Sequence, residues 1–407
     1  MLRFVATHPR ILAFGVLLTL FSSFGQTFII SIFVPKILES FSLGTGEFGM
    51  LYAGATLASA FCLPYFGRMI DRVSLTRFSL FTGLGLVAAC FTMAASWNVP
   101  MLFMAIVGLR LTGQGLLSLT ASTTMARVFD EGRGKALSVS SLGYPLGEGL
   151  LPLLVVLLIH ATGWRASWWI LGALILFLLL PAMYSLVGRQ SHTAKAAIAG
   201  AGPVRPRPSL YRDPIFYLLL PSNLFLPMVL TALFLYQIPL AESRGWSAAT
   251  MASAFIGFAV FRMIASLIVG PMIDRHTSLK ILPYLLIPAA LGLLILVSFS
   301  SPWAAFPYLI LVGVSQGMAG PVMTAVWAEV YGVESLGATK GAVATLGVIA
   351  TALGPVALGI LLGTGIGFDS VIKTCIAAAL GVIAISWIGN RRLHARSPGR
   401  AVGDRPQ

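Results

Sequence analysis

The sequence predicts an all-α membrane protein with twelve transmembrane helices in two pseudo-symmetric halves of six. Of its 407 residues, 57% are hydrophobic and only 10% are charged, whereas soluble domains carry about 25% charged residues. Its mean hydropathy is +0.90. Long continuous apolar runs, such as residues 11–34, fit helices rather than the alternating strands of a barrel.

Twelve apolar runs have the length that a membrane-spanning helix needs, which is about 20 residues. They are expected at residues 11–34, 46–67, 77–96, 101–125, 136–159, 165–187, 215–238, 247–269, 279–300, 303–328, 338–362 and 367–390. A stretch rich in Ala, Gly, Pro and Arg, residues 188–214, is expected to be a cytoplasmic linker. This divides the chain into an N-terminal half (1–187), a C-terminal half (215–390) and a polar cytoplasmic tail (391–407).

A net charge of +14 could indicate nucleic-acid binding, but the positions of the basic residues indicate a membrane protein instead. The basic residues stand in short loops between apolar runs, so the lipid bilayer is expected as a partner and nucleic acid is not. Of the 27 Lys and Arg residues, 21 fall on one side of the predicted spans. The positive-inside rule then predicts a multi-pass protein of the cell (inner or plasma) membrane with both termini in the cytoplasm. The three cysteines lie in apolar runs without metal-ligand spacing, so no metal site is expected.

Two segments repeat across the chain. Residues 67–72 read GRMIDR and residues 270–275 read GPMIDR, an offset of 203. Gln114 and Gln316 each precede a glycine in the fourth and tenth predicted helices, an offset of 202. A repeat of half the chain length is typical of a duplicated transporter.

The first of these segments opens a loop of the form G-x-x-x-D-R-x-x-x-x-R, which resembles the signature of the major facilitator superfamily. The matching residues are Gly67, Asp71, Arg72 and Arg77 in the first copy and Gly270, Asp274 and Arg275 in the second. The resemblance covers essentially the whole chain. It implies a secondary transporter in which these loops act as a cytoplasmic latch between conformations, and it implies a monomer. The alternative is an ordinary basic loop that obeys the positive-inside rule.

Within the superfamily, two further segments are similar to the monocarboxylate and organic-anion branches. One is the motif that begins at Arg110 in the fourth helix, and the other is the loop at residues 126–137. The eighth helix carries Arg262, although the acidic residue that accompanies this arginine in the branch is absent from the helix.

Three ionisable residues stand deep inside predicted helices, namely Arg110, Glu148 and Arg262. Glu148 occupies the proline position of a G-x-x-x-G-P motif that otherwise matches at Gly143 and Gly147, which argues against a multidrug antiporter. Charges inside a membrane are costly unless they are paired or face a cavity. Because the resemblance places the fifth and eighth helices at the interface between halves, Glu148 and Arg262 are expected to pair there. Glu148 is the candidate proton-coupling residue, and a static structural pair is the alternative.

Two arginines against one glutamate leave an excess of positive charge, which favours a small anionic substrate such as a carboxylate. The candidate substrate-binding residues are Arg110, Arg262, Gln26, Gln114, Tyr144, Asn223, Gln237 and Gln316. For the polar residues the alternative is hydrogen bonding between helices, and for Arg110 it is satisfaction by helix carbonyls.

The leading hypothesis is therefore a proton-coupled transporter of a small organic anion, such as a symporter, that works by alternating access, with protons as its second partner. The sequence has no nucleotide-binding loop, zinc-type cluster or Ser-His-Asp arrangement. No catalytic residue, cofactor or metal is expected, and the protein is not expected to be an enzyme. The alternatives are a drug or metabolite efflux antiporter, and a membrane receptor or sensor on a transporter scaffold.

Overall fold

The computed structural model describes residues 2–71, 73–129, 133–187, 210–332 and 336–396. These residues form helices and connecting turns, without a strand. Eleven of the helices are long and apolar enough to cross a membrane, and a bent pair at the N-terminal end makes a twelfth. The expected class, an all-α protein with twelve membrane spans, is confirmed.

The N-terminal half begins with a short helix and then contains six spans, three of which include a 3-10 or π segment. Its helices are α1 (Leu2–Thr7), α2 (Pro9–Phe21), η1 (Ser22–Gly25), α3 (Thr27–Ile30), η2 (Ser31–Phe33), α4 (Val34–Phe41), α5 (Thr45–Gly67), η3 (Arg68–Asp71), α6 (Leu75–Ala95), α7 (Val99–Gly108), η4 (Leu109–Leu117), α8 (Ser118–Val128), α9 (Arg133–Ser140), α10 (Gly143–Thr162), α11 (Trp164–Leu174), η5 (Ile175–Leu179) and α12 (Leu180–Val187).

The C-terminal half repeats the arrangement with longer uninterrupted helices. Its helices are η6 (Leu210–Arg212), α13 (Pro214–Leu235), α14 (Gln237–Ser243), α15 (Ala248–His276), α16 (Ser278–Ile281), η7 (Leu282–Tyr284), α17 (Ile287–Ser298), η8 (Pro302–Ala304), α18 (Ala305–Tyr331), α19 (Leu336–Gly363) and α20 (Phe368–Arg396). Helix α20 continues six residues beyond the predicted span. Most of the expected linker, residues 188–209, lies outside the described residues.

Local sequence signals set several helix starts. The side chains of Ser74, Asn98, Asp213 and Ser247 each accept a hydrogen bond from a backbone N–H in the first turn of the helix that follows. Such caps satisfy donors that the first turn of a helix leaves without a partner. These four residues therefore fix where α6, α7, α13 and α15 begin.

The first span is bent rather than straight, contrary to the single run predicted at 11–34. Its two parts, Pro9–Gly25 and Thr27–Phe41, meet at an angle of 47°. The break is at Gln26, whose backbone is extended (φ −84°, ψ 153°). Irregular backbone at this depth is tolerated in membrane proteins where neighbouring helices or a cavity satisfy its polar groups.

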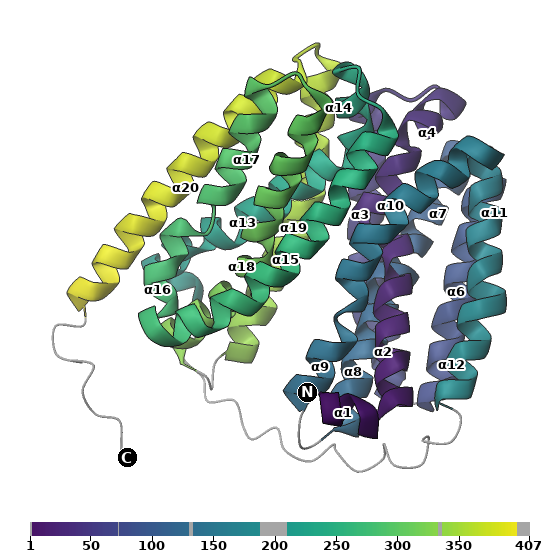
Figure 1. The fold of residues 1–407 in the computed structure, drawn as a ribbon, viewed down its shortest axis with the longest axis horizontal. Helices are drawn as coiled ribbons and strands as arrows, with labels where there is room; N and C mark the ends of the chain where they lie inside the picture. Colours follow the sequence, from purple (N-terminus) through teal and green to yellow (C-terminus); the bar gives the residue numbers. More distant parts are fainter. Residues whose placement is uncertain (1, 72, 130–132, 188–209, 333–335, 397–407) are drawn as a thin grey trace.

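The two halves approach each other at one end of the bundle and draw apart toward the other (Figure 1). We call the end that carries α1 and the last turn of α20 the terminal end, and the opposite end the distal end. Helices α5 and α19, α10 and α15, α3 and α13, and α4 and α14 contact one another across the halves. In α5, Tyr52 is fully buried, whereas Phe61 and Tyr65, closer to the terminal end, are 82% and 70% exposed.

The distal interface rests on small residues and backbone hydrogen bonds. The Tyr236 hydroxyl of the C-terminal half donates to the Thr45 carbonyl oxygen at 2.7 Å. The Thr45 hydroxyl donates to the Gly359 carbonyl oxygen at 3.1 Å. A Cβ added to Gly49 would lie 2.8 Å from the Pro355 carbonyl oxygen, so only glycine permits this approach of α5 to α19.

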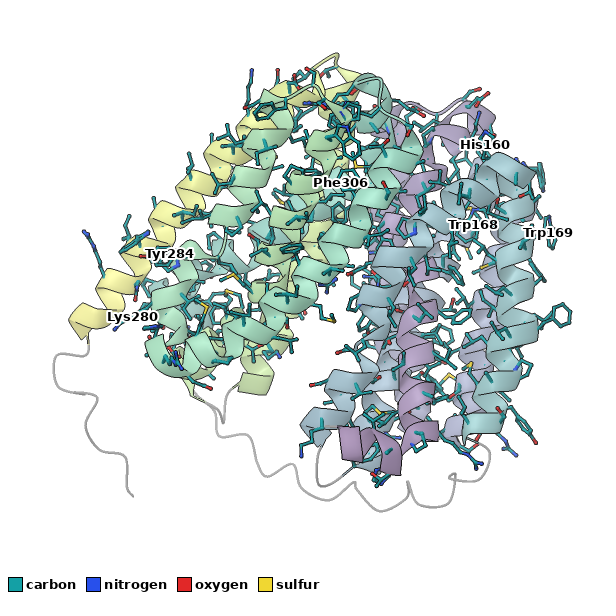
Figure 2. The ribbon with its side chains drawn as sticks, in the orientation of Figure 1. His160, Trp168, Trp169, Lys280, Tyr284 and Phe306 are labelled. Carbon is teal, nitrogen blue, oxygen red and sulfur yellow. The ribbon has the colours of Figure 1, made fainter. Side chains whose placement is uncertain are left out.

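In the N-terminal half, large aromatic residues mark both the inside and the lipid-facing side. In α11, Trp168 is fully buried and its ring centroid lies 4.6 Å from that of Phe33 in the first span. Its neighbour Trp169 is 47% exposed and lies at the outer edge of the N-terminal half (Figure 2). One helix face thus faces the core and the next faces the bilayer.

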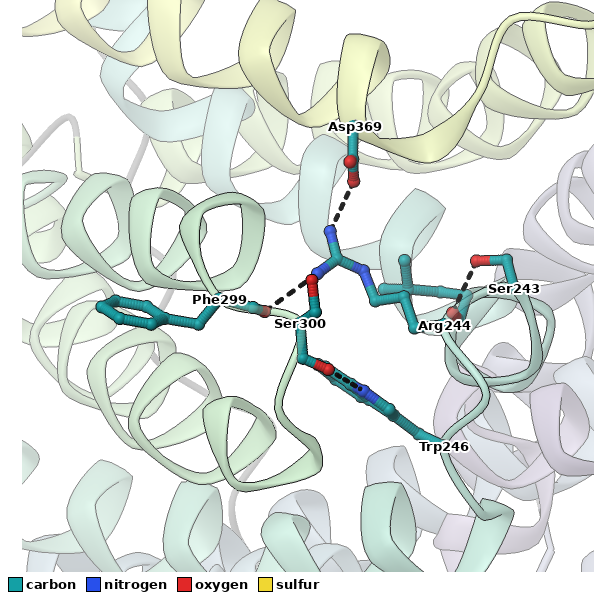
Figure 3. A network of polar contacts seen from close by, with 7 residues as sticks. Ser243, Arg244, Trp246, Phe299, Ser300 and Asp369 are labelled. Atoms are coloured by element: carbon teal, nitrogen blue, oxygen red, sulfur yellow. Dashed lines mark hydrogen bonds and ion pairs between the residues drawn. The ribbon is translucent and has the colours of Figure 1, made fainter.

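An arginine ties together the distal end of the C-terminal half (Figure 3). Arg244 follows α14, and its Nη1 donates to the Phe299 carbonyl oxygen at the end of α17, at 3.2 Å. Its Nη2 forms an ion pair with Asp369 at the start of α20, at 2.5 Å. The neighbouring Trp246 donates its indole N–H to the Ser300 carbonyl oxygen at 2.8 Å. Three connections between helices are therefore joined at one point.

The N-terminal half has a matching arrangement around Arg165, at the start of α11. Its Nη1 donates to the carbonyl oxygen of Ala94 at 3.1 Å and to that of Ser96, at the end of α6. The guanidinium carbon lies 4.3 Å from the Trp164 ring centroid and 5.8 Å from that of Phe41, the last residue of α4. We call these two arrangements the distal clamps.

Candidate functional site

The first and fourth spans cross where both have irregular backbone. A Cβ added to Gly25, beside the break in the first span, would lie 2.1 Å from the Leu109 carbonyl oxygen and 2.5 Å from the Gln114 backbone nitrogen. A Cβ added to Gly113 would lie 2.7 Å from the Gly25 nitrogen. The crossing therefore requires both glycines. In the fourth span it falls within η4, a π-helical segment of a kind often found at functional sites.

Arg110, in this π-helical segment, is a buried cation with neutral partners among the described residues. The residue as a whole is only 5% exposed. Nη1 donates to the Gly25 carbonyl oxygen at 3.4 Å and to Thr27 Oγ1 at 3.3 Å. The guanidinium carbon lies 5.3 Å from the Tyr52 ring centroid, and the Tyr52 hydroxyl is 2.8 Å from Thr27 Oγ1. Within the described residues Nε has no hydrogen-bond partner.

Glu148 of α10 and Arg262 of α15 form an ion pair across the two halves. The side chains are 12% and 28% exposed, respectively. Of the carboxylate, only Oε1 is engaged by the arginine, and Oε2 has no hydrogen-bond partner within the described residues. The arginine also lies 6.0 Å from the Phe258 ring centroid. Tyr144, one turn before the glutamate, lies within electrostatic reach of both charges. The structure thus brings together three of the residues singled out in the sequence.

Glycines around Glu148 orient it toward α15. A Cβ added to Gly147 would lie 2.0 Å from Ser23 Oγ in the first span, so α10 packs on the first span through this face. On the opposite side, a Cβ at Gly149 would be 3.3 Å from that of Ala259 in α15. The G-x-x-x-G pattern in α10 thus serves close helix packing.

Aromatic side chains connect the surroundings of the two arginines. Phe28 immediately follows Thr27, which accepts a hydrogen bond from Arg110, and the Phe28 ring centroid lies 6.3 Å from that of Phe255 in the other half. Phe255 in turn lies 5.6 Å from Phe258, the ring nearest to Arg262. These three buried rings therefore form a continuous apolar contact between the surroundings of the two arginines.

Of the other candidate residues, Gln237 lies at the interface between the halves. Its Nε2 donates to Ser31 Oγ at 2.7 Å and to the Phe28 carbonyl oxygen at 3.2 Å. Its Oε1 is buried without a hydrogen-bond partner among the residues described, and so is Oε1 of Gln316 in α18. Buried acceptors without a hydrogen-bond partner are exceptions in folded proteins.

The remaining three polar candidates are spread over both halves. Gln26 is half-buried at the break in the first span, and Gln114 is half-buried in the π-helical segment next to Arg110. Asn223 accepts a hydrogen bond from the Trp327 indole N–H at 3.5 Å, inside the C-terminal half. The structure therefore places Gln26 and Gln114 beside the helix crossing, and it engages Asn223 with a neighbouring helix.

The first copy of the expected latch follows α5, which ends at Gly67. The side chain of Asp71 and all of Arg72 lie outside the described residues, and Arg77 lies in the first turn of α6, where its backbone N–H is capped. Sequence reasoning missed Arg127, in the last turn of α8, whose Nη1 donates to a carbonyl oxygen of the 3-10 segment η3 at 3.1 Å. Its position within the segment 126–137, which resembles the organic-anion branches, was the available signal.

The second copy differs from the expectation of a loop after residue 269. Gly270, Asp274 and Arg275 all lie within α15, which continues to His276. Its internal Pro271 does not end the helix. The second copy is therefore the last two turns of a long helix rather than a connecting loop.

A sequence model of the Major Facilitator Superfamily matches residues 16–355 and 230–404. The chain belongs to the major facilitator superfamily. Among curated proteins it is 27% identical over 357 residues to monocarboxylate transporter 4 of Rattus norvegicus, covering 82% of this chain and 72% of the relative. It is 32% identical over 161 residues to the fosmidomycin resistance protein of Escherichia coli (strain K12), covering 38% of each.

Solved structures support the same fold. A bacterial homologue of the human lysosomal transporter Spinster, in an inward-facing and unoccupied conformation, gives a TM-score of 0.73 at 14% identity and covers 97% of this chain and 99% of that one. The nucleoside transporter NupG gives a TM-score of 0.66 at 12% identity, with coverage of 97% and 99%. The protein is therefore a membrane-spanning transporter of this superfamily, whose members are not enzymes.

Proposed function

We propose that this protein moves a small organic anion, with a carboxylate as its charged group, across the membrane by alternating access coupled to protons. The observation that carries the proposal is Arg110, a buried guanidinium that has only neutral partners among the described residues. A buried charge without a counter-ion is costly in a membrane protein, and an anionic substrate would neutralise it. The similarity to a monocarboxylate transporter over 82% of the chain is consistent with this substrate class.

The proposed binding site lies between the halves, with Arg110 at one side and the aromatic rings of Phe28 and Phe255 beside it. A planar guanidinium can bind both oxygens of a carboxylate, and the rings would contact its apolar part. Gln237 and Gln316, each with a buried amide oxygen that lacks a hydrogen-bond partner among the described residues, are the proposed donors and acceptors for substituents on the substrate.

Glu148 is the proposed coupling residue. While it is ionised, it holds Arg262 and thereby joins α10 to α15 across the halves. When a proton binds, the ion pair is lost, Arg262 becomes available to the substrate anion, and the halves are free to rearrange. One charge change would thus act on both binding and conformation.

The proposed location is the inner or plasma membrane of the cell. In the proposed orientation the terminal end faces the cytoplasm. In this orientation the structure corresponds to a conformation open toward the cytoplasm, since the halves draw apart at the terminal end (Figure 1). The segments around residues 67–77 and 270–275 are proposed to meet and form the latch when that end closes. We propose that a single chain is the transporting unit.

Uptake into proteoliposomes tests the proposal. Vesicles that contain the full chain should accumulate a radiolabelled monocarboxylate, and an imposed proton gradient should raise the initial rate severalfold. Arg110→Gln should abolish uptake of the anion, whereas Arg212→Gln, which removes an exposed arginine at the terminal end, should leave it unchanged. Glu148→Gln should retain exchange of the anion but lose the response to the proton gradient, with the exposed Glu39→Gln as its control.

Absence of anion flux under any gradient would refute this function. The second candidate is proton-coupled efflux of a drug or metabolite, which is favoured by the 32% identity to a resistance protein over residues amounting to 38% of the chain. In that case cells that express the chain should tolerate higher concentrations of a compound, and addition of the compound to vesicles should release protons.

A further inference from the structure

Two adjoining hollows form one groove in the C-terminal half. The first, of about 290 Å³, lies between the end of α15, the segment from α16 to η7, and α18, and is lined by Met272, His276, Lys280, Tyr284 and Met318 together with Ile281. The second, of about 270 Å³, continues along α15 and α18 and shares Met272 and Met318 with the first. We call the continuous hollow the flank groove.

At the end formed by α16 and η7, the flank groove lies on the outer side of the C-terminal half. Lys280 and Tyr284 lie on the side of the C-terminal half that faces away from the N-terminal half (Figure 2). The walls along α15 are exposed, with Ile264 and Ile268 at 39% and 56%. Because α15 is a membrane-spanning helix, lipid is the surrounding medium for these side chains.

The groove has the length and polarity of a phospholipid. Its lining on α15 runs from Phe261 to His276, which is about 22 Å at the rise of an α-helix. Half of the bilayer hydrocarbon is about 15 Å thick, so the groove is long enough for an acyl chain and part of a headgroup. Its deeper part is apolar, and its end nearest the terminal end carries His276 and Lys280.

Among the residues that line that end, Lys280 is the cation and none is a carboxylate. Lys280 and His276 are exposed there, and Arg275 is exposed on the preceding position of α15. The nearby carboxylates are Asp274, which is exposed on the same helix, and Glu329 of α18, whose Oε1 accepts the Ser278 backbone N–H at 2.9 Å. Basic pockets between transmembrane helices at a membrane surface attract anionic headgroups.

We propose that the flank groove is a binding site for an anionic phospholipid of the leaflet at the terminal end. One acyl chain lies along Ile264, Ile268 and Met272, and the phosphate contacts Lys280 and His276. Tyr284 lies farther from the terminal end than Lys280 (Figure 2), where its ring suits the boundary between the headgroups and the hydrocarbon. This site is independent of the proposed substrate site, because its lining residues include neither of the arginines that are candidates for substrate binding.

Native mass spectrometry of the purified full chain tests the site, with phosphatidylglycerol and phosphatidylcholine of identical acyl chains as probes. The wild-type chain should retain phosphatidylglycerol at least tenfold more than phosphatidylcholine. The combined variant Lys280→Gln and His276→Gln should lose this preference. Ile268→Trp, which fills the apolar part, should lower retention of phosphatidylglycerol. The control Lys135→Gln removes an exposed lysine of the N-terminal half and should retain it fully.

A photoactivatable phosphatidylglycerol gives a second measurement on the unaltered protein. Crosslinks should concentrate on peptides that contain Met272 and Met318, which both hollows share. Equal retention of the two lipids by the wild-type chain, full preference in the Lys280 and His276 variant, or crosslinks spread evenly over the bundle would each overturn the proposal.

Discussion

The ion pair between Glu148 and Arg262 makes the relative arrangement of the two halves sensitive to a single charge. Replacing Glu148 by Gln keeps the shape of the side chain and removes the anion, which leaves Arg262 close to the Phe258 ring and 28% exposed. Breaking a buried ion pair by removing one partner costs about 3–5 kcal/mol. Because Arg262 retains some exposure, we expect the lower value of about 3 kcal/mol.

This energy acts on the ratio between conformations that contain the pair and those that do not. Since about 1.4 kcal/mol corresponds to a tenfold change in an equilibrium constant, Glu148→Gln should change the ratio by about 100-fold. Arg262→Gln should have a similar effect. In the double variant no charge is left without a partner, so its effect should be smaller than that of either single variant.

Pulsed electron resonance measures the distance between spin labels at the terminal end. Labels at Tyr65 of α5 and Lys340 of α19 are suited to this, because both side chains are exposed and the helices belong to different halves. Cys62, Cys90 and Cys375 are first replaced by serine or alanine. The reasoning is refuted if the single variants leave the distance distribution unchanged, or if the effect of the double variant equals the sum of the two single effects.

Three further changes test the packing that supports the site. Gly147→Ala should destabilise the detergent-solubilised protein by about 2 kcal/mol, because its Cβ would lie 2.0 Å from Ser23 Oγ. Adding Ser23→Gly should reverse most of the resulting fall in melting temperature. Arg244→Gln should lower the free energy of unfolding by about 1 kcal/mol and speed hydrogen exchange in the loop after α17. Unchanged exchange in this loop would show that the distal clamp does not hold it. Tyr236→Phe removes the hydrogen bond to Thr45, so the population in which the halves are separated at the distal end should rise about fivefold. Spin labels on α4 and α14 measure this population. An unaltered population would show that this bond does not hold the distal end together.

The number and position of the spans could be predicted because lipid imposes a compositional rule on every spanning helix. The expected span 46–67 is observed as Thr45–Gly67, and 279–300 as the stretch Ser278–Ser298. Hydropathy does not report on tertiary contact, however. The bend at Gln26 depends on Gly25 meeting the fourth span, which no local pattern encodes, and the extension of α15 through Pro271 to His276 was missed because its last two turns are polar.

The charged part of the site could be predicted for a different reason. Ionisable residues are rare inside apolar runs, so Arg110, Glu148 and Arg262 were conspicuous. The neutral partners were not predictable. Thr27 and Tyr52, which hold Arg110, carry hydroxyls of a kind that occurs throughout these helices and is usually satisfied by the helix's own carbonyls.

The distal clamps show how a duplicated chain can keep a contact while exchanging its chemistry. Ser96 and Phe299, whose carbonyl oxygens receive the two arginines, are 203 residues apart, which equals the spacing of the internal repeat. The arginines themselves do not correspond. The repeat equivalent of Arg244 is Phe41, which lies under Arg165 in the other half.

In the C-terminal half the cation is Arg244, which comes from the segment before the second span of that half. In the N-terminal half it is Arg165, which comes from the start of the sixth span. What the two copies have in common is a meeting point of three helix ends that needs one positive group, and either of two neighbouring positions can provide it. Moving the arginine of one half to the position used by the other half, together with its partner, should thus be tolerated, whereas deleting it should not. In this chain the two copies share the contact but not the residue that makes it.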